Sequence, residues 1–278
     1  MLKTRIITAV ILFVVLVAVL FSGSLPAVQA LVAVAFFATA WEAFRLFKLR
    51  APIVVAACWA IAFLYTFFLN AGLEQARFWL ALGAAIWLLR FFPSLKVGLP
   101  PMEGFGNTLL AMVYGATLVS CFVAILVLFQ VSPLYLISVM AIVFIADIGA
   151  YFSGKKFGRR KLAPTISPGK SVEGAIGGWI AVLVLGSLTI LAAPYQPWLQ
   201  DTFAVRMQAK LGWGIALATL SVIVGASIVG DLFESQLKRR AGFKDSSNLL
   251  PGHGGVLDRI DALVPALPIA ALVGGWLR

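Results

Sequence analysis

Apolar runs separated by short charged or turn-forming segments dominate this chain. Nine such runs can be distinguished: residues 5–21, 26–41, 52–70, 77–92, 106–130, 133–152, 174–193, 211–232 and 255–276. Each approaches the roughly 20 residues of helix that a bilayer requires. The pattern therefore predicts an all-α integral membrane protein, a polytopic bundle of about nine transmembrane helices.

Composition supports the same class. The chain has 278 residues, of which 62% are hydrophobic and only 12% are charged, about half the charged fraction typical of a soluble protein. Its only two cysteines, Cys58 and Cys121, both lie inside apolar runs. We therefore expect buried thiols, and neither a structural disulfide nor a cysteine metal cluster.

Positive charge is unevenly distributed along the chain. If Lys3 and Arg5 place the N-terminus in the cytoplasm and the runs alternate from there, 18 of the 22 Lys and Arg residues fall in cytoplasmic regions. Such an excess is the usual mark of cytoplasmic loops in membrane proteins. Loop bias thus explains the net charge of +11, and no nucleic-acid partner is expected.

The first thirty residues permit two interpretations. Two basic residues, an apolar run and then Ala27-Val28-Gln29-Ala30 are similar to a secretory signal with a small-residue cleavage site. An uncleaved first span is the interpretation that we favour. Cleavage would leave the orientation of the later spans unchanged.

The two halves of the chain differ in chemistry. Residues 1–130 are predicted to form an N-terminal scaffold of about five spans. The acids there, Glu42, Glu74 and Glu103, lie near predicted membrane boundaries, where we expect solvated anchoring. Residues 131–278 are predicted to form a catalytic region of about four spans, with cytoplasmic loops at 153–173 and 233–254.

Seven of the eleven carboxylates lie on or near the predicted cytoplasmic face of the second half: Asp147, Glu173, Asp231, Glu234, Asp245, Asp258 and Asp261. Acids at the ends of spans usually face a polar cavity or a partner. Asp231 and Glu234 are three residues apart, as are Asp258 and Asp261, and this spacing puts each pair on one helical face. Oxygen ligands of this kind suit Mg²⁺. The alternative is that these acids pair with Arg239, Arg240 or Arg259.

Bases and glycines surround these acids. Lys238 to Lys244 is strongly basic, and Pro251-Gly252-His253-Gly254-Gly255 follows. Glycines let the backbone approach a ligand, and exposed N–H groups can hold phosphate oxygens. A ninth helix beginning near Gly254 would add a dipole that favours an anion. Acids for a metal beside bases for phosphates are typical of phosphoryl or nucleotidyl transfer. For His253, the only histidine, nucleotide contact and a structural hydrogen bond both remain open.

The loop before the seventh run continues the theme. Gly169-Lys170-Ser171 is similar to the end of a P-loop, but Pro164 occupies the place of the first glycine. We also expect no strand before it, so the P-loop interpretation is rejected. Gly174 and Gly178 form a GxxxG pattern that predicts close helix packing.

Residues 235–261, SQLKRRAGFKDSSNLLPGHGGVLDRID, resemble the phosphatidate cytidylyltransferase family throughout. The runs at 147–151 and 167–174 are similar to that family as well. The specific resemblance covers about the last 130 residues, and the first four spans match only in hydropathy.

The resemblance implies that CTP and phosphatidate react to give CDP-diacylglycerol and pyrophosphate. It also implies dependence on Mg²⁺, with K⁺ as a candidate second cation, a homodimer, and a location in the bacterial inner membrane. The family's metal-binding aspartates fall on Asp231 and Asp258, with Asp261 in support. Catalytic roles are expected for Asp231, Asp258, Lys238, Arg239 and Lys244. Contacts with substrate are expected from Ser235, Asp245, His253, Gly254, Gly255, Arg259, Ser167, Lys170, Glu173 and Asp147.

Three other functions are less consistent with the pattern. A transporter often carries charged residues inside its bundle, but these acids cluster at one face, and no clear inverted repeat is present. A related lipid-modifying transferase or kinase, with another nucleotide or a polyprenyl acceptor, is disfavoured by the long match at 235–261. A purely structural scaffold would need neither buried acids nor a phosphate-binding loop.

Overall fold

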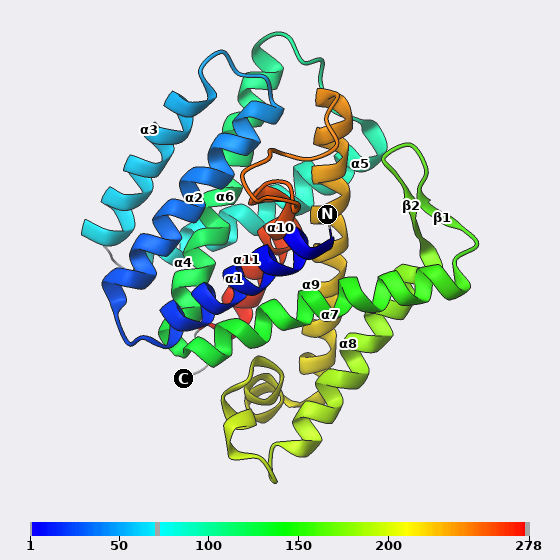
Figure 1. The fold of residues 1–278 in the computed structure, drawn as a ribbon. Helices are drawn as coiled ribbons and strands as arrows, with labels where there is room; N and C mark the ends of the chain where they lie inside the picture. Colours follow the sequence, from blue (N-terminus) through cyan, green and yellow to red (C-terminus); the bar gives the residue numbers. More distant parts are fainter. Residues whose placement is uncertain (1, 70–72, 276–278) are drawn as a thin grey trace.

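The computed structural model describes the backbone of residues 2–69 and 73–275, with the side chains of residues 7–68 and 75–275. The ends of two predicted runs, at residues 70 and 276, lie outside this described part, as do the side chains of Lys3, Arg5, Glu74 and Arg278. Helices make up most of the fold, and one small β-hairpin stands beside them (Figure 1).

The α-helices are α1 (Leu2–Phe21), α2 (Leu25–Leu46), α3 (Pro52–Leu64), α4 (Leu73–Ile86), α5 (Phe92–Val97), α6 (Phe105–Val131), α7 (Pro133–Phe157), α8 (Val172–Ala192), α9 (Phe203–Ala241), α10 (Leu257–Ile260) and α11 (Leu263–Gly274). Two π-helical turns, η1 (Tyr65–Leu69) and η2 (Trp87–Phe91), continue α3 and α4, and η3 (Pro197–Asp201) is a 3₁₀ turn.

Six helices in the described part are long and apolar enough to cross a membrane: Leu25–Leu46, Gln75–Val97, Phe105–Val131, Pro133–Phe157, Val172–Ala192 and Phe203–Ala241. Three shorter apolar helices are Ile7–Phe21, Pro52–Phe68 and Leu263–Gly274. Each of the nine predicted runs coincides with one of these helices. The all-α membrane class is therefore confirmed, whereas the number of spans remains a prediction.

Helix α9 is longer than the predicted eighth span, and the predicted loop 233–254 is wrong over residues 233–241. The helix continues to Ala241 because Phe233, Leu237 and Ala241 keep an apolar stripe at a spacing of four residues and are buried. It ends where Gly242 adopts φ 80°, the left-handed conformation that commonly terminates helices. Its start also differs, since a break at Gly212 joins an additional segment that begins at Phe203.

The predicted ninth span is two helices, α10 and α11, and neither begins near Gly254. Gly254 lies in a turn with φ 80°, and α10 is a single turn that begins at Leu257. Pro265 has no N–H and so cannot bond to the carbonyl of Asp261. A continuous helix across residues 257–274 therefore lacks a hydrogen bond at this point.

A β-hairpin replaces most of the predicted loop 153–173. Helix α7 extends to Phe157, and β1 (Lys161–Ala163) then pairs antiparallel with β2 (Ser167–Ser171). The expectation that no strand precedes Gly169-Lys170-Ser171 is therefore wrong, because β1 does. The P-loop interpretation still fails because Lys170 lies within the strand instead of a loop. Ser171 caps α8, its Oγ accepting the N–H of Gly174 at 3.1 Å.

Small residues bring α7 and α8 into close contact, as the GxxxG pattern predicts. A methyl group at Gly178 would overlap the carbonyl oxygen of Ala146, and one at Gly174 would lie 2.8 Å from the carbonyl oxygen of Ala150. The packing role predicted for the two glycines is confirmed.

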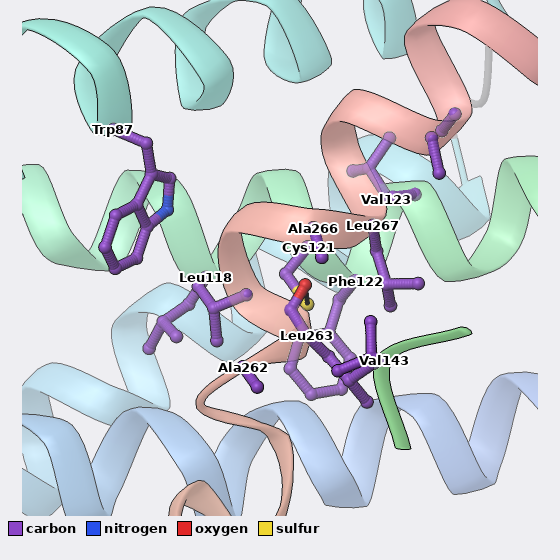
Figure 2. Close-up of a cluster of buried hydrophobic side chains, with 14 of the residues drawn as sticks. Trp87, Leu118, Cys121, Phe122, Val123, Val143, Ala262, Leu263, Ala266 and Leu267 are labelled. Carbon is purple, nitrogen blue, oxygen red and sulfur yellow. Dashed lines mark hydrogen bonds between the residues drawn. The ribbon is translucent and has the colours of Figure 1, made fainter. Parts of the chain in front are cut away.

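The two halves of the chain share one hydrophobic core. Figure 2 shows Leu263, Ala266 and Leu267 of α11 packed with Cys121 and Phe122 of α6. The Cys121 thiol lies 3.8 Å from the carbonyl oxygen of Leu263. Cys121 is buried as expected, whereas the expectation for Cys58 is wrong, because its position on α3 leaves it exposed.

Hydrogen bonds join the C-terminal part of α9 to the ends of N-terminal helices. Gln236 donates to the carbonyl oxygen of Ser94 at 3.0 Å, and Arg240 donates to Asn107 Oδ1 at 2.6 Å. Asn107, near the start of α6, donates in turn to the carbonyl oxygen of Phe47 just after α2. The ends of α2, α5 and α9 and the beginning of α6 therefore meet at one end of the bundle.

Candidate active site

Lys238 of α9 connects two buried carboxylates. Its Nζ lies 2.7 Å from Asp258 Oδ1 and also contacts Glu234 Oε2, one helical turn earlier. The side chains of Lys238, Glu234 and Asp258 are only 15%, 1% and 3% exposed. Removing charges from water is costly unless they are paired, and this arrangement supplies one cation for two acids. Two acids therefore share one cation below the protein surface.

Asp258 is also held by the loop before it. Its Oδ2 accepts hydrogen bonds from Ser246 N at 2.9 Å and from Gly255 N at 2.8 Å, and the Ser246 hydroxyl lies 2.9 Å from the same oxygen. Burial alone would raise the pKa of Asp258. Hydrogen bonds, among them those from Lys238 and Gly255, outweigh burial and lower the pKa to about 2. Asp258 is therefore a carboxylate at neutral pH.

Two further acids lie in the same electrostatic neighbourhood. Asp261 Oδ1 accepts the N–H of Ala262 at 2.8 Å. Burial and then the nearby charge of Asp231 raise the pKa of Asp261. Glu234 has no hydrogen-bond partner for either carboxyl oxygen within the described residues, apart from its ion pair with Lys238. Unsatisfied buried oxygens of this kind are rare and commonly mark a functional site.

Asp231, three residues before Glu234 on α9, forms an ion pair with Lys170 of β2. Both side chains remain more than a quarter exposed, at 28% and 29%. The pair borders a cavity of about 460 Å³, the hairpin cavity. Its lining includes Asp147, Tyr151, Lys155, Lys170, Ile228 and Asp231. The hairpin cavity thus combines cations with apolar wall.

A second cavity, the loop cavity, has a volume of about 630 Å³ and is formed by the segment between α9 and α10. Its lining includes Lys244, Asp245, Asn248, His253, Gly254 and Arg259. The Nδ1 atom of His253 is buried and has no hydrogen-bond partner among the described residues. The loop cavity is therefore more polar than the hairpin cavity and carries donors for anionic or heterocyclic groups.

The structure brings together many of the residues expected in the site. Asp147, Lys170 and Asp231 lie at the hairpin cavity, and Lys244, Asp245, His253, Gly254 and Arg259 lie at the loop cavity. Lys238, Gly255, Asp258 and Asp261 form the buried group between them.

Other expected residues lie apart from this group or have different partners. Glu173 accepts hydrogen bonds from the backbone N–H groups of Arg159 and Arg160, so it holds the turn after α7. Ser167 opens β2, Ser235 lies on α9, and Arg239 is exposed there. The alternative pairing of the acids with Arg239, Arg240 or Arg259 is not what the described residues show, since Lys170 and Lys238 are the partners.

The acids expected to bind metal do not form a closed cluster. In the part of the chain described, no group of three or more His, Cys, Asp or Glu side chains lies close enough to hold an ion. Lys170 and Lys238 contact the two aspartates concerned. Mg²⁺, however, is commonly bound by one or two carboxylates together with substrate phosphates. The donor chemistry of Asp231 and Asp258 therefore fits such an ion.

The sequence analysis missed Glu42. The expectation of a solvated anchor is wrong, because the side chain is fully buried and accepts hydrogen bonds from the loop between α9 and α10. The N-terminal half therefore contacts the loop between α9 and α10 directly, and its role as a scaffold stays a prediction. The sequence shows that Glu42 lies at the end of an apolar run. Its neighbours in the sequence do not distinguish a buried, hydrogen-bonded acid from a solvated one.

Comparison with known proteins gives consistent matches. A family model described as "Cytidylyltransferase family" matches residues 3–276. A Bacillus subtilis protein named phosphatidate cytidylyltransferase is 34% identical over 277 residues, covering 96% of this chain and 95% of its own length.

Two further relatives carry the same name. The Pseudomonas aeruginosa protein is 48% identical over 157 residues, or 54% of this chain and 53% of the relative. The Haemophilus influenzae protein is 50% identical over 133 residues, or 48% and 43% respectively. The chain spans about half the length of these two relatives.

Proposed function

Because this chain belongs to the cytidylyltransferase family, we propose that it transfers a cytidylyl group from CTP to phosphatidate, giving CDP-diacylglycerol and pyrophosphate. The family resemblance found in the sequence is confirmed by the match over residues 3–276. The observation that carries the proposal is that two aspartates lie at cavities that both contain cations: Asp231 lines the hairpin cavity, and Asp258 bonds the loop that lines the loop cavity.

The two cavities suit different substrates. The loop cavity has cations in Lys244 and Arg259, and Gly254 exposes backbone there. These features match a triphosphate, whose oxygens accept charged and backbone donors. The hairpin cavity places Lys155 and Lys170 beside apolar wall such as Ile228. That combination suits a lipid phosphate whose acyl chains remain in the bilayer.

The reaction needs little proton transfer. A phosphatidate oxygen, already anionic, attacks the α-phosphorus of CTP, and the bond from that phosphorus to the bridging oxygen of pyrophosphate breaks. Lys155 and Lys170 would hold the attacking phosphate, and Lys244 and Arg259 the triphosphate. Positioning and preorganised charge then supply most of the catalysis.

Mg²⁺ is proposed as the cofactor, with K⁺ as a candidate second cation. Asp231 and Asp258 would hold it, with Asp261 in support, since these acids supply the oxygen ligands that Mg²⁺ prefers. The bound ion would neutralise charge on the triphosphate. Lys170 and Lys238 contact the two aspartates in this structure. Their ammonium groups could instead donate hydrogen bonds to the phosphate oxygens of a substrate.

We further propose that the protein crosses the bacterial inner membrane nine times, with its N-terminus and its active site on the cytoplasmic side. We also propose that it forms a homodimer. The excess of Lys and Arg in alternate loops supports the orientation. The ends of α2, α5, α6 and α9 meet near the acidic group of Asp231, Glu234 and Asp258. This arrangement supports a site at one face of the membrane. The relatives are bacterial proteins.

The test is CTP-dependent conversion of phosphatidate by purified protein in mixed micelles, with Mg²⁺ or with EDTA. We expect labelled CDP-diacylglycerol and pyrophosphate in equal amounts with Mg²⁺ and none with EDTA, and CTP should be preferred over ATP, GTP and UTP. Absence of product from folded protein under every cation would reject the proposal. Product from another nucleotide at an equal rate would reject the assignment of CTP.

A further inference from the structure

Glu42 lies near the C-terminal end of α2, more than 200 residues from the loop that it contacts. Its side chain is fully buried. A buried carboxylate is costly unless hydrogen bonds replace the water that it loses. Glu42 obtains these bonds from outside its own helix, so its environment depends on how the two halves of the chain pack.

Both carboxylate oxygens of Glu42 receive two contacts. Oε1 accepts from Ser247 Oγ at 2.5 Å and from Val256 N at 3.1 Å. Oε2 accepts from Leu257 N at 2.6 Å and lies 3.1 Å from Ser246 Oγ. One side chain therefore connects the segment just after α9 to the first residues of α10.

The connected segment carries the loop cavity. Residues 248–254 contribute Asn248, His253 and Gly254 to its lining, and they lie between the two anchor points on Glu42. The backbone is also pressed against the carboxylate, because a methyl group at Gly255 would lie 2.6 Å from Glu42 Cδ. The shape of the loop cavity is thus determined in part by a residue of the N-terminal half.

Ser246 extends the connection to the acidic group. Its hydroxyl lies 3.1 Å from Glu42 Oε2 and 2.9 Å from Asp258 Oδ2, and its N–H donates to the same Asp258 oxygen at 2.9 Å. One hydroxyl proton can serve only one of the two carboxylates at a time. The position of Asp258 therefore depends on the position of Glu42.

We propose that Glu42 is a positioning residue that holds residues 246–257 in the conformation that binds the nucleotide and presents Asp258. The proposal rests on the proposed function, because it takes CTP as the occupant of the loop cavity. Glu42 itself touches no substrate in this assignment, since it is buried beneath the loop.

The test compares Glu42→Gln with Glu103→Gln, which changes an exposed acid of the same half. Glutamine keeps the size of Glu42 but loses the charge and replaces an acceptor by a donor. Loss of hydrogen bonds to a charged group predicts a rise of about tenfold in KM for CTP, whereas KM for phosphatidate should stay within about twofold. Glu103→Gln should leave both constants at the wild-type value.

Amide hydrogen exchange gives a measurement that does not depend on activity. Exchange at Val256 and Leu257 should accelerate about tenfold or more in Glu42→Gln, and Glu103→Gln should not change it. Ser247→Ala removes one donor and should give the same pattern with smaller changes, so it replaces Glu42→Gln if that variant does not fold.

Two results would overturn the proposal. The first is that Glu42→Gln changes neither the KM for CTP nor the exchange rates. The second is that its activity falls only as much as the amount of folded protein falls, with both KM values unchanged. If wild-type protein makes no product, the proposed function fails separately. Exchange at residues 256 and 257 then decides by itself whether Glu42 holds the loop.

Discussion

The C-terminal part of α9 takes part in two lysine–carboxylate contacts that differ mainly in burial. On the hairpin side, Lys170 and Asp231 are 29% and 28% exposed. On the loop side, Lys238, Glu234 and Asp258 are 15%, 1% and 3% exposed, and the loop donates further hydrogen bonds to Asp258. The same pair of functional groups therefore occurs once near solvent and once in a nearly closed environment.

This difference separates two roles. An ion pair with access to water contributes about 0–1 kcal/mol to stability, so Lys170 can exchange its partner for a substrate phosphate at little cost. Breaking a buried pair costs about 3–5 kcal/mol because it leaves an uncompensated charge. The loop side is therefore expected to support both the fold and the chemistry, and the hairpin side the chemistry alone.

The largest effect is expected from Lys238→Met. The variant leaves Glu234 and Asp258 buried without their shared cation, so the free energy of unfolding should fall by about 3–5 kcal/mol. Denaturant titration in detergent micelles measures it. Adding Glu234→Gln removes one of the two buried acids and should restore part of the loss. A stability equal to wild type would show that the buried group is neutralised by other means.

Asp258→Asn should come next and should act on turnover. The amide cannot balance Lys238, and its NH₂ group would face donors if it replaced Oδ2. Loss of one preorganised electrostatic group predicts a fall in kcat of about 10²–10³-fold. Initial rates of CDP-diacylglycerol formation, normalised to folded protein, test this. Asp201→Asn, at an ion pair with Arg206 far from the site, is the control and should keep wild-type rates. Near-normal turnover of Asp258→Asn would remove Asp258 from the mechanism.

Lys170→Met should have the smallest effect on the fold and a selective one on binding. Its pair is partly exposed, so the free energy of unfolding should change by no more than about 1 kcal/mol. Loss of one charged donor predicts a rise of about tenfold in KM for phosphatidate, with KM for CTP unchanged. Separate titrations of the two substrates decide the matter. A rise confined to CTP would exchange the assignments of the two cavities.

Several elements were predictable because they depend on local pattern. The apolar runs coincide with helices because unbroken hydrophobicity over this length favours a helix in lipid. The contact of α7 with α8 followed from Gly174 and Gly178, whose missing side chains permit close approach. The long motif at 235–261 was enough to suggest the family.

The errors have identifiable physical causes. The predicted end of α9 is too early because Glu234 and Lys238 resemble loop residues, although Phe233 and Leu237, each directly before one of them, keep the helix packed. The β-hairpin was missed because β1 and β2 are only three and five residues long and carry little apolar alternation. The split of the last helix into α10 and α11 was also not predicted, because the apolar pattern continues across it.

The sequence alone determined the membrane class, the approximate helix positions, the family and the segments that carry acids and bases. These follow from composition, period and contiguous motifs, which need no knowledge of packing. Only the tertiary structure decided that Lys170 pairs with Asp231, that Lys238 lies between Glu234 and Asp258, and that Glu42 binds the loop between α9 and α10. Apart from the contact between Lys238 and Glu234, which lie one turn apart on α9, these contacts join segments that meet only after the helices pack. The burial of these side chains is also a result of that packing.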